Sequence, residues 1–345
     1  MPGGRASGSP LDEAAGAAGP HTVEGFKLLS DETRLAILLA LWEAYDPEEG
    51  RGTVSFSDLC DRVGAADSGN FAYHLDKLAG RFVDEHEAGY ALSNAGHRVV
   101  RSVIAGTGLE EATLEPTEIP RSCPTCGDPL EITYRDQRLY QRCSECEGSL
   151  GPSSPLRAPE GTVTVHDDFE PAGLAGRTPE EVFVAGTIDQ TLALALVVRG
   201  VCPACTGSIE DALHVCEDHD PPVGHRCGAC GTRDEVRARY VCSVCKFNVS
   251  YPAWCVTLDH PASLAFYHDH GFEGTYGLED PETTARLWER FRRRQQIVDR
   301  DPLRVRVVVE DAGETLALLL DGELDVIEVE GPRPVAAERA SLGDR

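Results

Sequence analysis

The sequence predicts a multidomain α+β protein in which helices and short antiparallel strands form separate modules. Its 345 residues exceed the size of about 250 to 300 residues at which a single hydrophobic core stops growing. Residues 21–106 carry helical periodicity and turn signals, and most of the 13 cysteines lie after them. Ten cysteines form five C-x-x-C pairs, which in a reducing compartment predict metal-bound β-hairpins rather than disulfides.

The composition is strongly acidic, with 58 acidic against 32 basic residues and a formal net charge of -26. Lysine occurs only at Lys27, Lys77 and Lys246, and the other basic residues are arginine. A chain that is acidic, poor in lysine and rich in arginine looks like a cytosolic protein of a halophile that accumulates salt. In molar salt, counterion release contributes little to nucleic-acid affinity, so base contacts and shape would have to carry more of it.

Hydropathy predicts a cytoplasmic protein without a membrane partner. No apolar run approaches the roughly 20 residues of a membrane span, and residues 192–198, for example, are only seven. Residues 1–20 have neither the basic start nor the apolar core of a signal peptide, and their Gly, Ala and Pro content predicts a disordered tail.

Residues 21–106 show the element order of a winged helix-turn-helix domain. Within residues 21–45 we expect a helix with residues 30–33 as its N-cap region and apolar side chains at i, i+3, i+4 and i+7 on its buried face: Leu35, Leu38, Leu39 and Trp42. A short helix over residues 57–63, capped by Ser57, precedes a turn at residues 64–66 and a second helix over residues 67–78.

A two-stranded wing completes this domain. Residues 81–87 and 90–93 alternate around the Ala88-Gly89 turn, and a last helix is expected from Asn94 to Ile104.

The helix over residues 67–78 is the expected DNA-reading element. Phe71, Leu75 and Leu78 share its inner face, which leaves a polar outer face free to enter a major groove. The expected DNA-binding residues are Ser68, Asn70, Tyr73, His74 and Lys77. The alternative interpretation makes this domain a dimerisation or protein-binding platform, and the acidic side chains of the wing weigh against binding dominated by phosphates.

The segment LLSDETRLAILLAL, followed by a helix-turn-helix containing AYHLDKL, resembles the ArsR-type winged-helix transcription regulators, which share a D-x-T-R-x-x-I-L opening. The resemblance covers residues 22–105 and implies a homodimer on a near-palindromic, double-stranded DNA operator. Metal-sensing members carry C-x-C in the first helix of the motif, where this chain has only Cys60. We therefore expect Cys60 to be a small buried hydrophobic residue.

The first cysteine group predicts a zinc ribbon over residues 122–150. Its two C-x-x-C knuckles flank 16 residues that can form a hairpin, and the four thiolates are Cys123, Cys126, Cys143 and Cys146. Four thiolates fill a tetrahedral site, so we expect a structural ion.

The second group, over residues 201–250, offers eight ligands for two further zinc ions: Cys202, Cys205, Cys216, His219, Cys227, Cys230, Cys242 and Cys245. In a sequential pairing, each ten-residue insert would fold into its own hairpin. In a nested pairing, one long hairpin would hold Cys202, Cys205, Cys242 and Cys245 at one end and the other four ligands at the far end. The Pro-rich segment 220–226 makes the better turn, which favours nesting.

The C-terminal part predicts helices followed by a β-meander. Thr178 and Glu181 form a capping box at the start of a mostly apolar helix. The phrase HPASLAFYHDHG resembles a recurrent C-terminal region of haloarchaeal winged-helix proteins. A further metal site from Cys255, His260, His268 and His270 is weighed against histidines at helix ends and a core cysteine.

An arginine-rich helix over residues 280–298 should present a solvated face or a contact for phosphate or an acidic partner. Three alternating segments within residues 303–330 follow it.

The resulting domain order runs from tail to tail. It is as follows: 1–20 disordered tail, 21–106 winged helix-turn-helix, 107–121 linker, 122–150 first zinc ribbon, 151–177 loop region, 178–200 helix, 201–250 second zinc-ribbon cluster, 251–300 helical segment, 301–331 β-meander and 332–345 disordered tail.

These features predict a DNA-binding transcription regulator whose zinc ribbons are structural and position an effector or assembly region. The sequence shows no glycine-rich phosphate loop, nucleophile elbow or H-E-x-x-H motif, so an enzyme is not expected. Two alternatives remain open. One is a zinc-ribbon adaptor that binds protein or RNA and uses the winged helix as a dimer core; the other is a thiol and zinc redox sensor.

Overall fold

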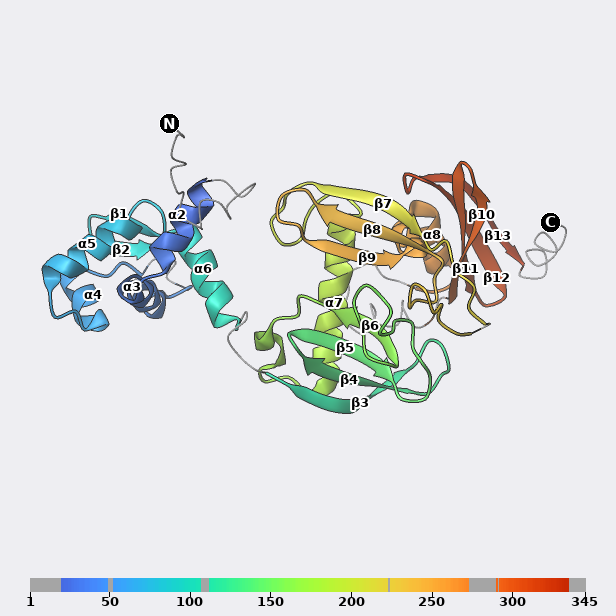
Figure 1. The fold of residues 1–345 in the computed structure, drawn as a ribbon, viewed down its shortest axis with the longest axis horizontal. Helices are drawn as coiled ribbons and strands as arrows, with labels where there is room; N and C mark the ends of the chain where they lie inside the picture. Colours follow the sequence, from blue (N-terminus) through green and yellow to red (C-terminus); the bar gives the residue numbers. More distant parts are fainter. Residues whose placement is uncertain are drawn as a thin grey trace, which may run out of the picture. The chain divides into compact units, whose positions relative to one another are not determined.

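The computed structural model describes residues 20–48, 52–106, 112–222, 224–272, 290 and 292–334. The chain divides into two compact units, residues 1–110 and 111–345, which are treated separately below (Figure 1). Both contain helices and antiparallel strands, which confirms the predicted α+β, multidomain class. Within the described ranges, no helix has the length and apolar character needed to cross a membrane. Residues 1–19 and 335–345, which make up most of the two expected tails, lie outside the described residues.

Unit 1 has the winged-helix order of elements. They are α2 (Pro20–Leu29), α3 (Glu32–Glu43), α4 (Phe56–Val63), α5 (Ser68–Leu78), β1 (Val83–His86), β2 (Gly89–Leu92) and α6 (Asn94–Ile104). The N-cap region predicted at residues 30–33 is confirmed: Asp31 is extended, and its carboxylate accepts the backbone N–H of Arg34 as the N-cap of α3. α2 is a separate helix before this cap.

The buried face of α3 differs from the prediction. Ile37, Leu38 and Leu41 are buried, while Leu35 and Leu39 are 39% and 43% exposed. Residues 35–42 are all apolar, so helical spacing alone does not select which stripe of α3 faces the core.

The helix-turn-helix is held by local capping. The N-cap of α4 is Ser55 rather than the predicted Ser57, and its hydroxyl accepts from the Asp58 N–H at 3.2 Å. Gly64 ends α4 with φ of 67°, a left-handed conformation that favours glycine. Asp67 then caps α5 through the N–H groups of Gly69 and Asn70. The predicted inner face, Phe71, Leu75 and Leu78, is buried in the core of unit 1.

The wing is a β1–β2 hairpin paired from Val83↔Leu92 to His86↔Gly89. Gly89 has φ of 135°, and a Cβ at this position would lie 2.2 Å from the Val54 carbonyl oxygen. This close approach lets Val54 pair with Tyr90 through two backbone hydrogen bonds. The wing is thereby attached to the segment that precedes α4.

Unit 2 begins with a four-stranded antiparallel sheet in the order β3–β4–β5–β6. Its strands are β3 (Leu114–Ser122), β4 (Pro129–Arg135), β5 (Arg138–Cys143) and β6 (Thr162–His166). The linker predicted over residues 107–121 is therefore wrong from Leu114 onward, because this segment pairs with β4. The loop predicted over residues 151–177 likewise contains β6 and the 3-10 helix η2 (Pro171–Leu174).

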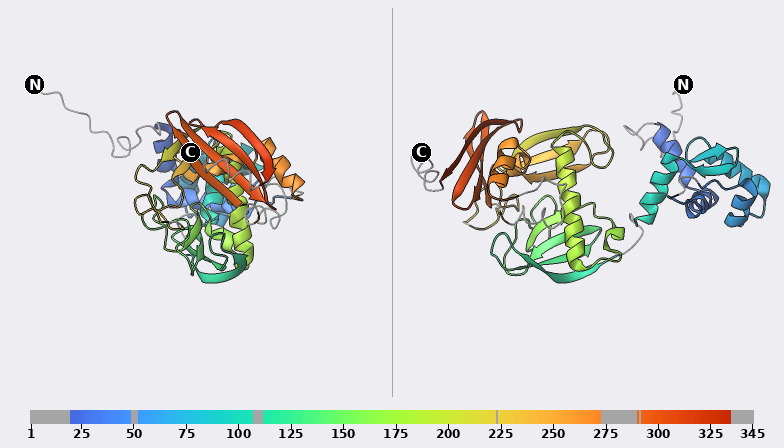
Figure 2. Two further views of the ribbon diagram at one scale, coloured as in Figure 1. Left: turned by 90° about the vertical axis from the view of Figure 1, so that its right-hand side faces the viewer. Right: turned by 180° about the vertical axis from the view of Figure 1, so that it is seen from behind.

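A second sheet consists of β7 (Ile209–Val215), β8 (Val236–Cys242) and β9 (Asn248–Pro252), all antiparallel. The helix α7 (Pro179–Val197) lies along both sheets, as Figures 1 and 2 show from three sides. Its Val182 and Phe183 join the core of the first sheet, and its Leu194 and Val197 join the core of the second. The predicted capping box of Thr178 and Glu181 is present.

After the second sheet come η3 (Ala253–Thr257) and α8 (Pro261–Asp269), whose N-cap is His260. A four-stranded meander follows, made of β10 (Arg292–Arg300), β11 (Leu303–Asp311), β12 (Glu314–Asp321) and β13 (Val326–Pro334).

The helix predicted over residues 280–298 is wrong from Arg292 onward, because β10 pairs with β11; residues 280–289 and 291 lie outside the described residues. One face of this meander packs on the second sheet, where Val305, Val307 and Leu320 are fully buried.

Candidate metal centres

Three groups of four ligands each bring their donor atoms within 4.8 Å of one another. Site 1 is Cys123, Cys126, Cys143 and Cys146; site 2 is Cys202, Cys205, Cys242 and Cys245; site 3 is Cys216, His219, Cys227 and Cys230. These are the twelve ligands predicted from the sequence, and the nested pairing of the second cluster is confirmed. The three groups fit three structural zinc ions.

Sulfur spacing tests this fit independently of the ligand types. Thiolates about 2.3 Å from a shared tetrahedral ion lie about 3.8 Å apart. At site 1, Cys123 Sγ lies 3.7 Å from Cys146 Sγ, and Cys126 Sγ lies 3.4 Å from Cys143 Sγ. At site 2, both cross-knuckle pairs are 3.6 Å apart. These separations are close to the tetrahedral edge and far longer than a disulfide bond of about 2.05 Å.

Site 1 is built by the turns at the ends of β4 and β5. The N–H of Cys123 donates to the Asp128 carbonyl at 2.7 Å, and the N–H of Gly127 donates to the Cys123 carbonyl at 2.9 Å. The left-handed Gly127, with φ of 86°, closes this knuckle. The register Leu130↔Cys143 brings the second knuckle alongside the first.

Sites 2 and 3 occupy opposite ends of the β7–β8 hairpin. Ile209 pairs with Cys242 at the site 2 end and Val215 pairs with Val236 at the other, which leaves about 20 Å of strand between them. At site 3, the Cys216 N–H donates to the Glu235 carbonyl at 2.9 Å, and Cys230 Sγ lies 3.5 Å from His219 Nδ1.

Backbone N–H groups prepare several of these thiols for metal binding. The N–H groups of Cys245 and Val244 lie 3.5 and 3.4 Å from Cys242 Sγ, and they lower the pKa of this thiol to about 6. The N–H of Cys230 likewise lowers the pKa of Cys227. Because the thiolate is the metal-binding form, these donors favour metal binding near neutral pH.

The further metal site weighed for the C-terminal histidines does not form among the described residues. His260 Nδ1 accepts from the Ala262 N–H as a helix cap, and His270 Nε2 pairs with Glu314 at 3.5 Å. Cys255 is buried in the core of the second sheet, where burial raises the pKa of its thiol. Cys60 is half-buried against the core of unit 1, with its Sγ 3.9 Å from the Ala65 carbonyl.

The residues expected to contact DNA divide into two groups on α5. Ser68, Asn70, Tyr73 and Lys77 are exposed, and the Lys77 ammonium lies 5.3 Å from the centre of the Tyr73 ring. The prediction for His74 is wrong, because its side chain is only 11% exposed and its Nδ1 lies 3.2 Å from Asp31. On a helical wheel His74 lies at the edge of the buried stripe, beside Leu78 and Phe71, and from there it joins α5 to the cap of α3.

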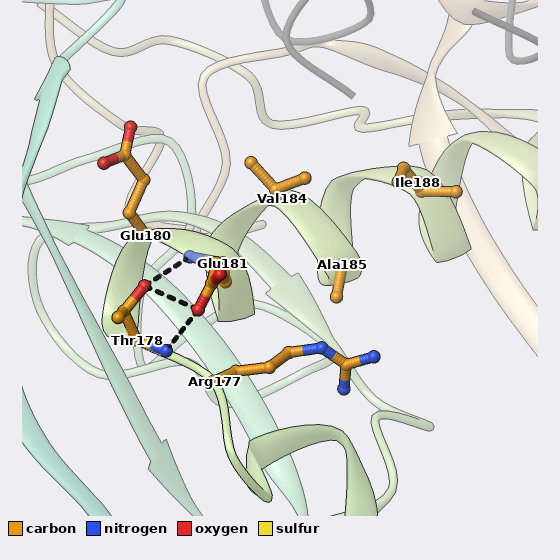
Figure 3. Close-up of a pocket in the computed structure, with 7 residues that line it drawn as sticks. All are labelled: Arg177, Thr178, Glu180, Glu181, Val184, Ala185 and Ile188. Carbon is orange, nitrogen blue, oxygen red and sulfur yellow. Dashed lines mark hydrogen bonds between the residues drawn. The ribbon is translucent and has the colours of Figure 1, made fainter. Parts of the chain in front are cut away.

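One surface hollow of about 580 Å³, which no sequence motif predicts, lies at the start of α7. Figure 3 shows that Thr178 and Glu181 there bind each other through the capping box, with Val184, Ala185 and Ile188 along the helix. Thr178 and Glu181 are thus used to start the helix, while Arg177 donates to the Gly173 carbonyl and Glu180 pairs with Arg121.

Comparison with known families places matches over both units. A family model described as "Domain of unknown function (DUF7351)" matches residues 120–326, and one described as "Domain of unknown function (DUF7347)" matches residues 22–103. No curated protein and no solved structure matches the chain. The first match spans all three metal sites, and the second spans most of unit 1.

Proposed function

Because the chain belongs to the family of the domain DUF7351, whose description assigns no activity, we propose its function from geometry: it is a DNA-binding transcription regulator of the ArsR winged-helix type. The observation that carries this proposal is the two-sided character of α5. Its inner face is buried in the core of unit 1, while Asn70, Tyr73 and Lys77 remain exposed on a helix that follows a tight helix-turn-helix. Such a helix can enter a major groove and present side chains to base edges.

A homodimer in the cytoplasm is part of the proposal. Exposed apolar side chains on three helices of unit 1 supply a surface for a second copy: Phe26 on α2, Leu35 and Leu39 on α3, and Val103 and Ile104 on α6. The helix α3 contacts both α2 and α6, so these side chains come from adjoining elements. A dimer places two α5 helices on one operator, which supplies affinity that phosphate attraction cannot provide in molar salt.

The metal ions hold structure in this proposal and carry no catalysis. Each site offers four protein ligands, so a tetrahedral ion keeps no open position for a substrate. The zinc ribbons then act as a rigid body for an effector, an assembly contact or a protein partner.

A mobility-shift assay in molar KCl with a defined promoter fragment tests the recognition helix. Replacing Asn70 and Tyr73 together by Ala should abolish sequence-specific binding, whereas Asn248→Ala, an exposed asparagine on β9, should leave it unchanged. Specific binding that survives the double substitution refutes the assignment of α5.

The second candidate function is an adaptor that binds protein or RNA through its zinc ribbons. One observation favours it: Asp84, Glu85 and Glu87 are all exposed on the wing, where they would repel a phosphate backbone. Recovery of bound partners from a lysate at native salt separates the two functions, since a regulator brings down defined promoter fragments and an adaptor does not.

A further inference from the structure

The ligand loops of site 1 and site 3 are joined by a partly buried polar contact, although site 3 is far from site 1 in the sequence. Glu147 directly follows the ligand Cys146, and Arg226 directly precedes the ligand Cys227. The backbone N–H of Arg226 donates to Glu147 Oε1 at 2.5 Å. The neighbouring His225 Nδ1 lies 3.4 Å from the same carboxylate oxygen. Two residues adjacent to ligands of different metal ions are thus in direct contact.

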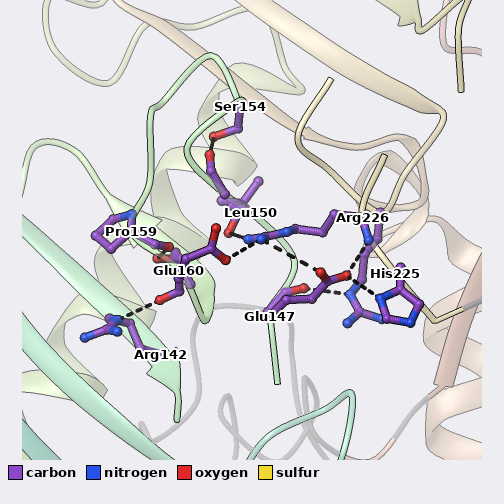
Figure 4. A network of polar contacts seen from close by, with 12 residues as sticks. Arg142, Glu147, Leu150, Ser154, Pro159, Glu160, His225 and Arg226 are labelled. Carbon is purple, nitrogen blue, oxygen red and sulfur yellow. Dashed lines mark hydrogen bonds and ion pairs between the residues drawn. The ribbon is translucent and has the colours of Figure 1, made fainter. Parts of the chain in front are cut away.

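The guanidinium of Arg226 extends this contact into the loop after site 1, as Figure 4 shows. Its Nη1 donates to the Leu150 carbonyl at 2.6 Å, and its Nη2 binds the Glu160 carboxylate. The Arg226 side chain is only 10% exposed, so the bond to Leu150 is partly shielded from water, whereas Glu160 reaches it from a side chain that is 66% exposed. Breaking them would leave a charged group and a carbonyl without their partners.

Backbone contacts on the other side of the site 3 loop reinforce the junction. The N–H of Gly151 donates to the Gly231 carbonyl at 3.1 Å, and Leu150 forms a β-bridge with Thr232. Arg233 Nε donates to the Gly148 carbonyl at 2.7 Å. The loop that carries Cys227 and Cys230 is therefore held at both of its ends by residues 147–151.

The junction is also closely packed. A Cβ on Gly151 would lie 2.3 Å from Arg226 Nη1, and one on Gly231 would lie 2.2 Å from the Ser154 backbone nitrogen. Contacts under 3.0 Å force atoms to move, so the two loops fit only in one relative position. Site 2 stands apart, because its knuckles close on Gly207 and Ser208 of their own hairpin.

We propose that sites 1 and 3 are coupled metal sites: an ion at either one raises the metal affinity of the other through Arg226, and site 2 is outside this coupling. A metal ion fixes the conformation of its ligand loop, and only the fixed site 3 loop presents Arg226 and Gly231 to residues 147–151. By thermodynamic linkage, the effect of site 1 on site 3 equals the effect of site 3 on site 1. We expect a coupling of about tenfold in affinity, within the roughly 5- to 150-fold range of coupled sites.

Cobalt substitution of the full-length protein tests the coupling, because site 3 has three thiolates and an imidazole whereas sites 1 and 2 have four thiolates. The ligand difference gives Co²⁺ at site 3 its own absorption bands. Chelator titration then reports the affinity of site 3 separately. Removing metal from site 1 by Cys123→Ser plus Cys126→Ser should weaken Co²⁺ at site 3 about tenfold, and in an Arg226→Gln background the same change should alter it less than twofold.

A second variant keeps all twelve ligands and every charge. Gly151→Ala should displace Arg226 and so weaken metal binding at sites 1 and 3. The Co²⁺ bands of site 3, and the half of the four-thiolate absorbance that comes from site 1, should then disappear at a lower chelator concentration than in the unaltered protein. The other half, from site 2, should be unchanged. Arg306→Gln, which removes a partly buried arginine paired with Glu330 in the meander, is the matched control and should change none of these signals.

Two results would overturn the proposal. One is a site 3 affinity that responds to the loss of site 1 equally with Arg226 present or replaced. The other is a Gly151→Ala protein whose release curves coincide with those of the unaltered protein.

Discussion

Removal of zinc should detach β7 from unit 2 while leaving the meander folded. No residue of β7 is fully buried, and the strand is an edge of its sheet, bonded only to β8. A hairpin of this kind is marginal on its own. Its ends are fixed by sites 2 and 3, and structural zinc contributes an apparent free energy of about 10–16 kcal/mol in small metal-dependent domains. This contribution is as large as the whole stability of many domains, about 5–15 kcal/mol. Without metal, β7 should therefore lose nearly all of the free energy that keeps the strand from opening.

Hydrogen exchange read by mass spectrometry measures this loss. A fall of about 4 kcal/mol in opening free energy corresponds to exchange about 1,000-fold faster, and we expect at least this change for the β7 amides after chelation. The strands β11 and β12 provide the internal control, because Val305, Val307, Leu318 and Leu320 are 0% exposed and pack without metal ligands. Amides of β7 that remain within tenfold of their zinc-bound exchange rates would refute the reasoning.

Three further predictions concern stability. Leu75→Ala should destabilise unit 1 by about 2–5 kcal/mol in denaturant unfolding, because it leaves a cavity in the core. Tyr73→Ala, on the exposed face of the same helix, should change the free energy of unfolding by less than about 0.5 kcal/mol. Equal losses of stability in the two variants would show that α5 is oriented wrongly. Asp67→Ala should remove the N-cap of α5 and lower the free energy of unfolding by about 1 kcal/mol. Circular dichroism should show a loss of helical signal, and an unchanged unfolding curve would contradict the prediction.

Burial lowers the pKa of His166 to about 4, from a value near 6.5 in the unfolded chain. Between pH 6.5 and 4 the unfolded chain therefore binds a proton on this imidazole that the folded protein does not. The free energy of unfolding should fall by up to about 3 kcal/mol as the pH drops through this range. Replacing His166 by Phe should flatten that part of the pH profile, and an equal slope in both proteins would count against a neutral, buried imidazole.

The metal sites were predictable because their signal is local. Each C-x-x-C fixes two thiolates in one knuckle, and the Pro-rich turn over residues 220–226 decides the nested pairing before any tertiary contact is known. The core face of α5 was predictable for the same reason, since Phe71, Leu75 and Leu78 recur at helical spacing within one short element.

The errors arise where a long-range partner decides the outcome. β3 contains Pro116 and Pro120 and reads as a linker, yet as an edge strand with two register shifts it tolerates both. β10 reads as a basic helix because four of its nine residues are arginine. In the strand, Arg293, Gln295 and Ile297 alternate as half-buried residues, and Gln295 bonds to the backbone of Trp254 and Val236, partners that the local sequence does not reveal. His74 lies at the edge of the core face of α5, and its partner Asp31 on a neighbouring element, which spacing within α5 does not reveal, takes it out of the exposed face.

Junctions between modules leave even less trace in the sequence. Arg226 is one arginine among many, and nothing near it in the chain indicates that its partners lie at Glu147, Leu150 and Glu160. Gly151 and Gly231 look like ordinary loop glycines until the spacing of the two loops shows that neither has room for a side chain.

Chromatin immunoprecipitation across the genome, with the unaltered protein and the Asn70→Ala, Tyr73→Ala variant expressed at equal levels, tests most directly whether α5 reads DNA. We predict discrete enriched sites that share a near-palindromic sequence for the unaltered protein, and loss of those sites for the variant. Enrichment at the same sites by both proteins, or no enriched sites with either, would contradict the proposed regulator.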